Sequence, residues 1–151
     1  MLGDDQKAEV GLSVSRGGRP GIVFNDREGR ARASLSVQED GGPILSFRDA
    51  RGKSRIVLDS LPDGTPGLSL RDADEVMRFS AVVLPGGTPG LNLVDSDGEA
   101  RVILHTTGDG QPHLRLLGKD RAVLFEAPAA GDVGAKPAPS RKGESPVPSE
   151  H

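Results

Sequence analysis

The sequence predicts an all-β protein built from five 23-residue β-hairpin repeats that follow an N-terminal half repeat. Prolines recur every 23 residues, at positions 20, 43, 66, 89 and 112, and glycines keep the same step two residues earlier. Each repeat also holds two short segments in which apolar and polar residues alternate. A fixed period of this length indicates a repeat architecture, and alternation with a period of two is typical of a half-buried strand.

The first strand of each repeat follows its proline. The second and fourth residues after the proline are apolar in every copy, and the residue between them faces the other side of the strand. These segments are Ile22-Val-Phe24, Leu45-Ser-Phe47, Leu68-Ser-Leu70, Leu91-Asn-Leu93 and Leu114-Arg-Leu116.

A turn and a second alternating strand complete the repeat. An aspartate stands at one common offset in four copies, as Asp26, Asp49, Asp72 and Asp95. Three residues later comes a glycine, except in the third repeat, where Glu75 takes its place. Asp and Gly are turn formers, so this pattern predicts a hairpin. The segment Val10-Gly-Leu-Ser-Val14 matches the second strand of a repeat, Ala33-Ser-Leu-Ser-Val37, and is the half repeat.

The spacing of the segments predicts how the strands align. If Asp95–Gly98 forms a four-residue loop, Leu91 lies opposite Val102. The connector before each proline reads as a three-residue loop, which places Leu104 opposite Leu114. Both loops keep the apolar residues on one face, whereas a slip of one residue would reverse every side chain.

The fifth repeat is shorter, and after it the pattern stops. Lys119-Asp120 is expected to form a two-residue loop that sets Leu116 opposite Val123. This repeat lacks two residues of the usual length. Because two is an even number, its apolar side chains still lie on the same face of the sheet.

Three regions follow from this pattern. Residues 8–126 form the repeat domain, and residues 1–7 are a flexible lead-in. Residues 127–151 are rich in Pro, Ala and Ser with almost no large apolar side chain, which predicts a disordered tail. Its Pro-x-Pro segments are read as linker.

An antiparallel meander with one apolar face must hide that face by closing into a barrel, by folding over, or by pairing with another copy. In the predicted register each hairpin is staggered by two residues, the shear that a closing barrel needs, which favours a curled or closed barrel-like meander. A β-solenoid with one 23-residue coil per rung is the alternative.

The motif Leu-x-Leu-x-Asp-x-x-Gly-x-x-Arg, seen from Leu91 to Arg101, resembles bacterial tandem-hairpin repeats such as the YD repeats of RHS proteins, although the tyrosines of that family are absent. The resemblance covers about residues 18–126. It implies a structural or surface role and transfers no functional residue.

Composition narrows the functional classes. The chain has no cysteine, which excludes disulfides, thiolate metal sites and a cysteine nucleophile. A net charge of −3 and the absence of Trp and Tyr argue against nucleic-acid binding. No apolar run is long enough to span a membrane and no signal-type segment is present, so no membrane insertion is expected and the default compartment is the cytoplasm.

Arginines recur on the polar face of the predicted sheet and form a candidate interaction stripe for an acidic partner. A solvated face that opposes aggregation is the simpler reading. The stripe consists of Arg32, Arg55, Arg78 and Arg101.

Other polar groups are weaker candidates for chemistry. The pairs Asp72/Asp74 and Asp95/Asp97 lie in turns and lack the further ligands of a calcium loop. His105 and His113 lack a third zinc ligand. The serines have no catalytic setting; among them are Ser34, Ser46, Ser69 and Ser80.

The sequence therefore predicts a non-enzymatic structural or protein-interaction module without a cofactor or metal, which binds a protein partner or itself. A small-molecule carrier with an apolar barrel interior is the alternative.

Overall fold

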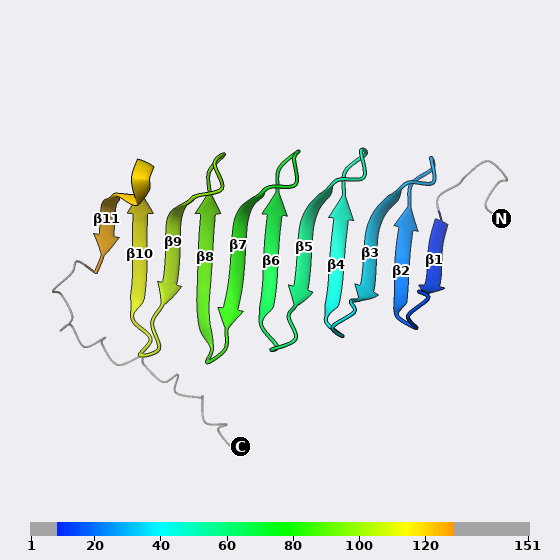
Figure 1. The fold of residues 1–151 in the computed structure, drawn as a ribbon, viewed down its shortest axis with the longest axis horizontal. Coiled ribbons are helices and arrows are strands. Elements are labelled where there is room, and N and C mark those ends of the chain that lie inside the picture. The colour runs from blue at the N-terminus through cyan, green and yellow to red at the C-terminus, as the bar shows by residue number, and fades with distance from the viewer. Residues whose placement is uncertain (1–8, 129–151) are drawn as a thin grey trace, which may run out of the picture.

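A computed structural model of the chain describes residues 9–128. They form one antiparallel sheet of eleven strands, in which every strand pairs with its neighbours in chain order (Figure 1). The strands are β1 Glu9–Val14, β2 Pro20–Asn25, β3 Ala31–Val37, β4 Pro43–Arg48, β5 Ser54–Ser60, β6 Pro66–Arg71, β7 Met77–Leu84, β8 Thr88–Val94, β9 Ala100–Thr106, β10 Pro112–Leu117 and β11 Val123–Ala127, with a 3₁₀ turn at Lys119–Arg121.

The all-β meander of five hairpins and a half repeat is confirmed. β1 is the half repeat, and each proline begins a strand or lies one residue inside it. The strands run antiparallel, so they are not the parallel rungs of the alternative solenoid. The predicted lead-in and almost all of the predicted tail lie outside the described residues.

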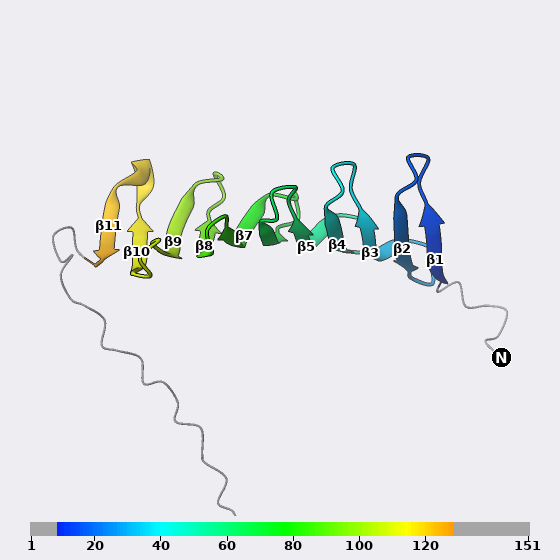
Figure 2. The same ribbon diagram turned by 90° about the horizontal axis from the view of Figure 1, so that it is seen from below.

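The sheet is open and twisted, not closed. β1 and β11 are its two edges, and Figure 2 shows that the strands at the two ends tilt in opposite senses out of the mean plane. The aspartate turns all lie along the upper edge in Figure 1, and the turns that precede the prolines lie along the lower edge.

The predicted register of the aspartate hairpin was wrong by two residues. Leu91 lies opposite Leu104 and not opposite Val102, which pairs with Leu93. The loop is one residue shorter than predicted, since the Asp95 N–H donates to the Glu99 carbonyl and Asp95 is therefore part of the hairpin stem. A β-bulge then takes up one more residue of β9. Because the two changes add to an even number, the apolar residues stay on one face.

The register of the fifth hairpin was also wrong by two residues. Leu116 lies opposite Phe125 instead of Val123, because the chain turns through the 3₁₀ segment Lys119–Arg121 and a bulge follows it. The other predicted alignment, Leu104 opposite Leu114, is confirmed.

The corrected registers explain why the sheet does not close. Leu91 pairs with Leu104 and Leu104 with Leu114, so equivalent residues of successive repeats lie on one straight line across the sheet. The predicted stagger of two residues per hairpin is therefore absent. A sheet without stagger has no shear, and a barrel requires shear.

The apolar face consists of three parallel rows. The Phe row, nearest the aspartate turns, includes all four phenylalanines of the chain, and the Pro row on the opposite side holds small and medium side chains. The Phe row is Val10, Phe24, Ala33, Phe47, Ile56, Leu70, Phe79, Leu93, Val102, Leu116 and Phe125; the middle row is Leu12, Ile22, Leu35, Leu45, Leu58, Leu68, Ala81, Leu91, Leu104, Leu114 and Ala127; the Pro row is Val14, Pro20, Val37, Pro43, Ser60, Pro66, Val83, Pro89, Thr106 and Pro112.

Nothing in the described chain covers these rows. Phe47 is 40% exposed and Leu58 is 44% exposed, although both lie near the middle of the sheet. Val57, on the polar face, is the one apolar side chain of residues 9–128 that is buried, and it is still 5% exposed. The structure is therefore a single layer with no hydrophobic core between two layers.

Candidate interaction surfaces

The four arginines of the predicted stripe occupy equivalent positions at the bulges. Each is the extra residue that has no partner on the neighbouring strand, as Arg101 is between Ala100 and Val102. Each lies six residues after the aspartate of its own turn. The fold thus places them on the polar face, directly beside the aspartate edge. The four are Arg32, Arg55, Arg78 and Arg101.

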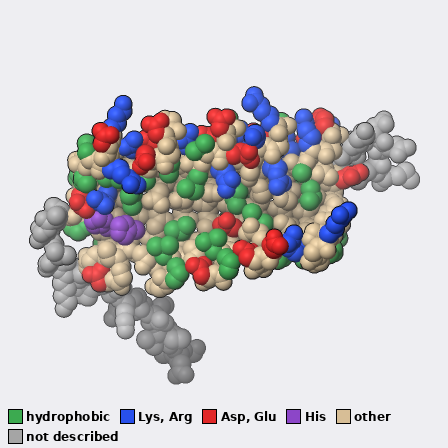
Figure 3. Space-filling model, viewed as in Figure 1, with side chains coloured by type: hydrophobic (Ala, Val, Ile, Leu, Met, Phe, Trp, Pro, Cys, Tyr) green, Lys and Arg blue, Asp and Glu red, His purple; other side chains and the backbone are tan. Residues whose placement is uncertain are grey.

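Each arginine pairs with its own turn aspartate. The Arg55 Nη2 lies 2.6 Å from Asp49 Oδ2, and Arg101 Nε lies 2.5 Å from Asp95 Oδ2. Arg78 pairs with Asp72 in the same way, and Arg32 lies 3.4 Å from Asp26. Figure 3 shows the polar face, where basic and acidic side chains are mixed along the upper edge, at which the aspartate turns lie.

Two of these arginines also connect neighbouring repeats. Arg78 donates a hydrogen bond to the backbone carbonyl of Asp95, and Arg101 donates to that of Gly118. A guanidinium has several donors in one plane, so it can hold its own carboxylate and the next turn together. These contacts give the arginines a structural role, and the binding stripe stays a prediction.

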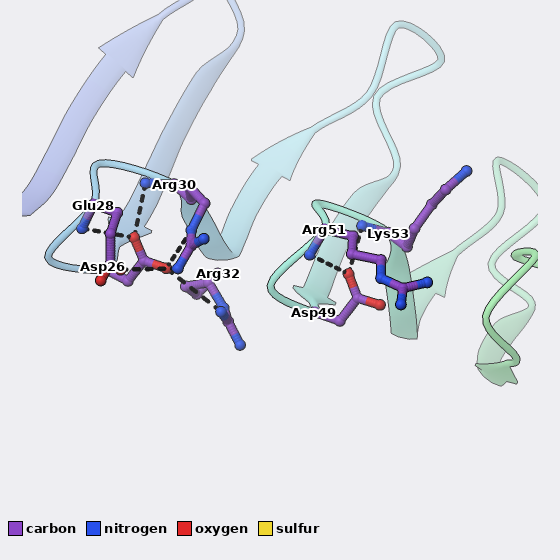
Figure 4. A network of polar contacts seen from close by, with 7 residues as sticks. All are labelled: Asp26, Glu28, Arg30, Arg32, Asp49, Arg51 and Lys53. Carbon is purple, nitrogen blue, oxygen red and sulfur yellow. Dashed lines mark hydrogen bonds and ion pairs between the residues drawn. The ribbon is translucent and has the colours of Figure 1, made fainter.

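The aspartates organise the turns from within. Asp26 Oδ1 accepts the N–H groups of Glu28 at 3.1 Å and Arg30 at 2.9 Å. Asp49 Oδ1 accepts those of Arg51 and Lys53. Figure 4 shows both carboxylates turned toward the backbone of their own turns. This is the geometry that favours Asp in turns, where its side chain bonds the backbone two residues on.

The hydrogen bonds lower the pKa of the turn aspartates. For Asp95, the N–H of Glu99 is the main cause, and Arg101 and the N–H of Asp97 add to it, while partial desolvation acts in the opposite direction. For Asp72, partial desolvation would raise the pKa, but the bonds from Arg78 and from the backbone of Asp74 outweigh it. Both groups are therefore charged structural acceptors at neutral pH.

In each carboxylate pair that was considered for calcium binding, the two members have different contacts. Asp72 and Asp95 bond their own turns, whereas the carboxylates of Asp74 and Asp97 make no hydrogen bond or ion pair with described residues. Within residues 9–128 no three His, Cys, Asp or Glu side chains lie close enough together to hold a metal ion.

The two histidines face each other across β9 and β10. Their ring centroids are 5.0 Å apart. His113 Nε2 lies 3.0 Å from Glu126 Oε1, and Arg115 Nε lies 3.4 Å from the same oxygen. Glu126 is a polar contact that the sequence analysis missed, because the register of β11 was displaced by two residues.

The serines form part of the packing of the polar face. Ser46 is 5% exposed and shares a hydrogen bond of 2.9 Å with Ser54, and Arg48 donates to Ser34 at 3.1 Å. Asn92 donates to Ser80. These bonds are structural links between neighbouring strands.

Glu75, the residue that replaces a turn glycine, connects two repeats. It has a φ of 65°, a left-handed conformation that is unfavourable for residues other than glycine. Its carboxylate accepts the Lys53 ammonium at 2.9 Å and the Ser54 N–H at 3.0 Å. The break in the glycine pattern was visible in the sequence, but the residues that it contacts were not.

The apolar face has no internal partner in the described part of the chain. Its rows contain no charged residue, and only Ser60 and Thr106 are polar. Over β1 to β4 it is hollowed by about 600 Å³, between Leu12, Ile22 and Leu35. The sequence predicted that one face is apolar; the structure adds that this face is open.

Comparison with known proteins adds no assignment. No protein-family model matches the chain, and no curated protein matches it. The resemblance to tandem-hairpin repeats therefore stays a prediction. Among residues 9–128 no helix has the length and apolar character needed to cross a membrane.

Proposed function

We propose that the chain is a non-enzymatic structural module that acts by binding protein through its apolar face. The observation that carries the proposal is that this face is uncharged and half exposed from one edge of the sheet to the other. Hydrophobic surface of this kind on a protein marks a contact with another macromolecule.

The size of the face supports the proposal. Eleven strands of about six residues cover about 50 Å by 20 Å, or about 1,000 Å². The largest exposed apolar patch on a monomeric protein is about 300–600 Å². Burying such a face at about 25 cal/mol per Å² gives a strong driving force for association.

The polar face contributes rigidity to this function. Each repeat is bonded to the next: Arg48 donates to Ser34 and the Ser54 N–H donates to Glu75. Arg78 and Arg101 donate to backbone carbonyls of the repeats that follow theirs. A surface that is already ordered loses less conformational entropy when it binds. The module is therefore a stiff platform for its contact face.

A small-molecule carrier is the second candidate function, and one observation favours it. The hollow over β1 to β4 is lined almost entirely by apolar atoms. It is open on one side, whereas the carrier hypothesis supposed an unfilled barrel interior. The hollow is part of the same face, so a ligand there would compete with a protein bound to that face.

Two measurements on the full chain test the proposed function. Light scattering gives the solution mass, and the fluorescence of an apolar dye such as anilinonaphthalene sulfonate reports accessible hydrophobic surface. We expect either an oligomer with little dye fluorescence or a monomer with strong fluorescence that a bound protein suppresses. A monomer that binds no dye would overturn the proposal, because its apolar face would be covered from within.

A further inference from the structure

We infer that the apolar face is covered by a second copy of this chain, stacked face to face about a two-fold axis that runs along the middle row. The inference rests on the proposed function, because it names the partner of the same surface. The result is a two-layered β-sandwich in which each strand lies over the same strand of the other copy, in the opposite direction.

This two-fold rotation places the three rows of one copy over the three rows of the other. The Phe row and the Pro row lie two residues to either side of the middle row. Rotation about the middle row therefore places the Phe row of one copy over the Pro row of the other. On β4, Phe47 would lie over Pro43 of the second copy, and Leu45 over its own equivalent.

This arrangement fills the space between the sheets evenly. The Phe row carries all four phenylalanines, while the Pro row consists of Val, Pro, Ser and Thr. Opposing large with small side chains is how layers interdigitate at native density. The same relation holds along every proline-containing strand, since each reads Pro-x-Leu/Ile-x-Phe/Leu.

A two-fold axis parallel to the strands is the other way to stack two identical faces. It would place the Phe row on itself and the Pro row on itself. One side of the sandwich would then be overfilled and the other would contain voids, both of which cost free energy. The distribution of the phenylalanines therefore favours the axis along the middle row.

The buried area is that of a stable homodimer. Two faces of about 1,000 Å² give about 2,000 Å² in total, at the boundary between standard and obligate interfaces. Neither copy has to bury a charge, because the rows contain none. Stacked sheets lie about 10 Å apart and keep their mean strand directions within about 30° of each other, and strands that lie over their own equivalents meet that condition.

Within residues 9–128 no segment covers the face, and the sequence of 151 residues has few large apolar residues outside them. Met1 and Leu2 are those that precede the described residues. Beyond Ala127, the sequence contains only Val133 and Val147 as large aliphatic residues, and none of its aromatic residues. This is far too little to replace a face of three apolar rows. A second copy supplies the right length and row spacing by construction.

Single cysteines in the full chain test the inference, because the native sequence has none. Leu45→Cys, Leu68→Cys and Leu91→Cys lie in the middle row, and a short bismaleimide reagent joins two thiols that meet across the axis. Ile44→Cys, Ser69→Cys and Asn92→Cys are the matched controls, each one residue away on the polar face. Circular dichroism confirms that each variant has the native strand content.

We expect all three middle-row variants to give at least about ten times more crosslinked dimer than their controls. Leu68 lies on the central strand and crosslinks with either axis, but Leu45 would lie about 20 Å from its equivalent if the axis were parallel to the strands. Crosslinking at Leu68 alone would therefore overturn the proposed arrangement. Equal crosslinking of the controls would overturn it as well, because the contact would not be through the apolar face.

The outcome also separates this inference from the proposed function. A monomer without crosslinks that still binds the apolar dye strongly would exclude the second copy and leave the face open for a different protein. A dimer whose middle-row cysteines do not crosslink would place the contact elsewhere and overturn the inference.

Discussion

The two faces of the sheet differ in chemistry and in how well the chain covers them. Ser46 and Phe47 are neighbours on β4 and point to opposite sides, yet the serine is 5% exposed and the phenylalanine is 40% exposed. On the polar face, arginine side chains and hydrogen bonds cover the strands. The polar face is covered by side chains of the same chain, whereas the apolar face has no cover among residues 9–128.

This contrast locates the stability of the protein in two places. The polar face and its turns hold each repeat to the next, through contacts that exist in a single chain. In the proposed dimer the apolar face would contribute more to stability than in one chain, because hydrophobic stabilisation scales with the area removed from water. Substitutions on the two faces should therefore differ in kind.

The largest effect is expected from a charge on the apolar face. Leu91→Lys should weaken dimerisation by about 100-fold or more, since the dimer would bury an unpaired charge from each copy. Because Leu91 is only half-buried in one chain, the monomer should still fold. The solution mass as a function of concentration gives the dissociation constant.

Asn92→Lys is the control for this variant, because it adds the same charge one residue away on the polar face. Its dissociation constant should stay within about threefold of the native value, since the proposed interface does not include the polar face. Equal weakening by both variants would mean that net charge, and not the apolar face, governs association.

The second-largest effect is expected from acid, which should destabilise the aspartate turns of the polar face. The turn aspartates have a pKa lowered by the hydrogen bonds that they accept in the folded state, so the charged form is bound more favourably there than in the unfolded chain. Their contribution is fully present above about pH 4, the ordinary pKa of an aspartate, and is lost as the pH falls toward the lowered value.

Urea denaturation between pH 7 and pH 2.5 measures this effect. The midpoint should change little down to about pH 5 and then fall. A midpoint that stays constant to pH 3 would show that the turn carboxylates do not stabilise the fold.

A single turn gives a smaller and more specific effect. Asp72→Ala removes an acceptor that serves Asp74, Val76 and Arg78, and should lower the melting temperature by about 5 °C. Asp74→Ala, in the same turn, removes a carboxylate with no hydrogen bond to a described residue and should change it by less than about 1 °C. Similar changes in both would contradict the role given to Asp72.

The smallest effect concerns one turn glycine. Gly98 has a φ of 82°, where a side chain is strained, so Gly98→Ala should cost about 1 kcal/mol of unfolding free energy. Gly108→Ala is the control, because a Cβ added there meets no atom within 4 Å and its φ is not in the left-handed region. The control should be neutral or slightly stabilising.

Most of the fold could be predicted from the sequence because the repeat displays the alternation many times over. The strand order, the turns and the side of the sheet on which each residue lies all follow from it. The sequence also predicted that the four arginines lie on the polar face and the four aspartates in turns, but not the ion pair between Asp95 and Arg101.

The bulge at each arginine was missed for a physical reason. Alternation reports only whether a residue lies on one face or the other, and a register displaced by two residues leaves that unchanged. Leu91 faces the same side whether its partner is Val102 or Leu104. Yet those two residues decide between a staggered sheet that could close and a straight one that cannot.

The straight alignment of the repeats has a consequence for evolution. Because no offset accumulates from one hairpin to the next, gaining or losing 23 residues would change the width of the protein by two strand spacings, about 10 Å, without disturbing the remaining hairpins. In the proposed homodimer, one insertion or deletion in the gene would change the width of both sheets by the same amount. The width of such a protein would therefore change in fixed steps of one 23-residue repeat.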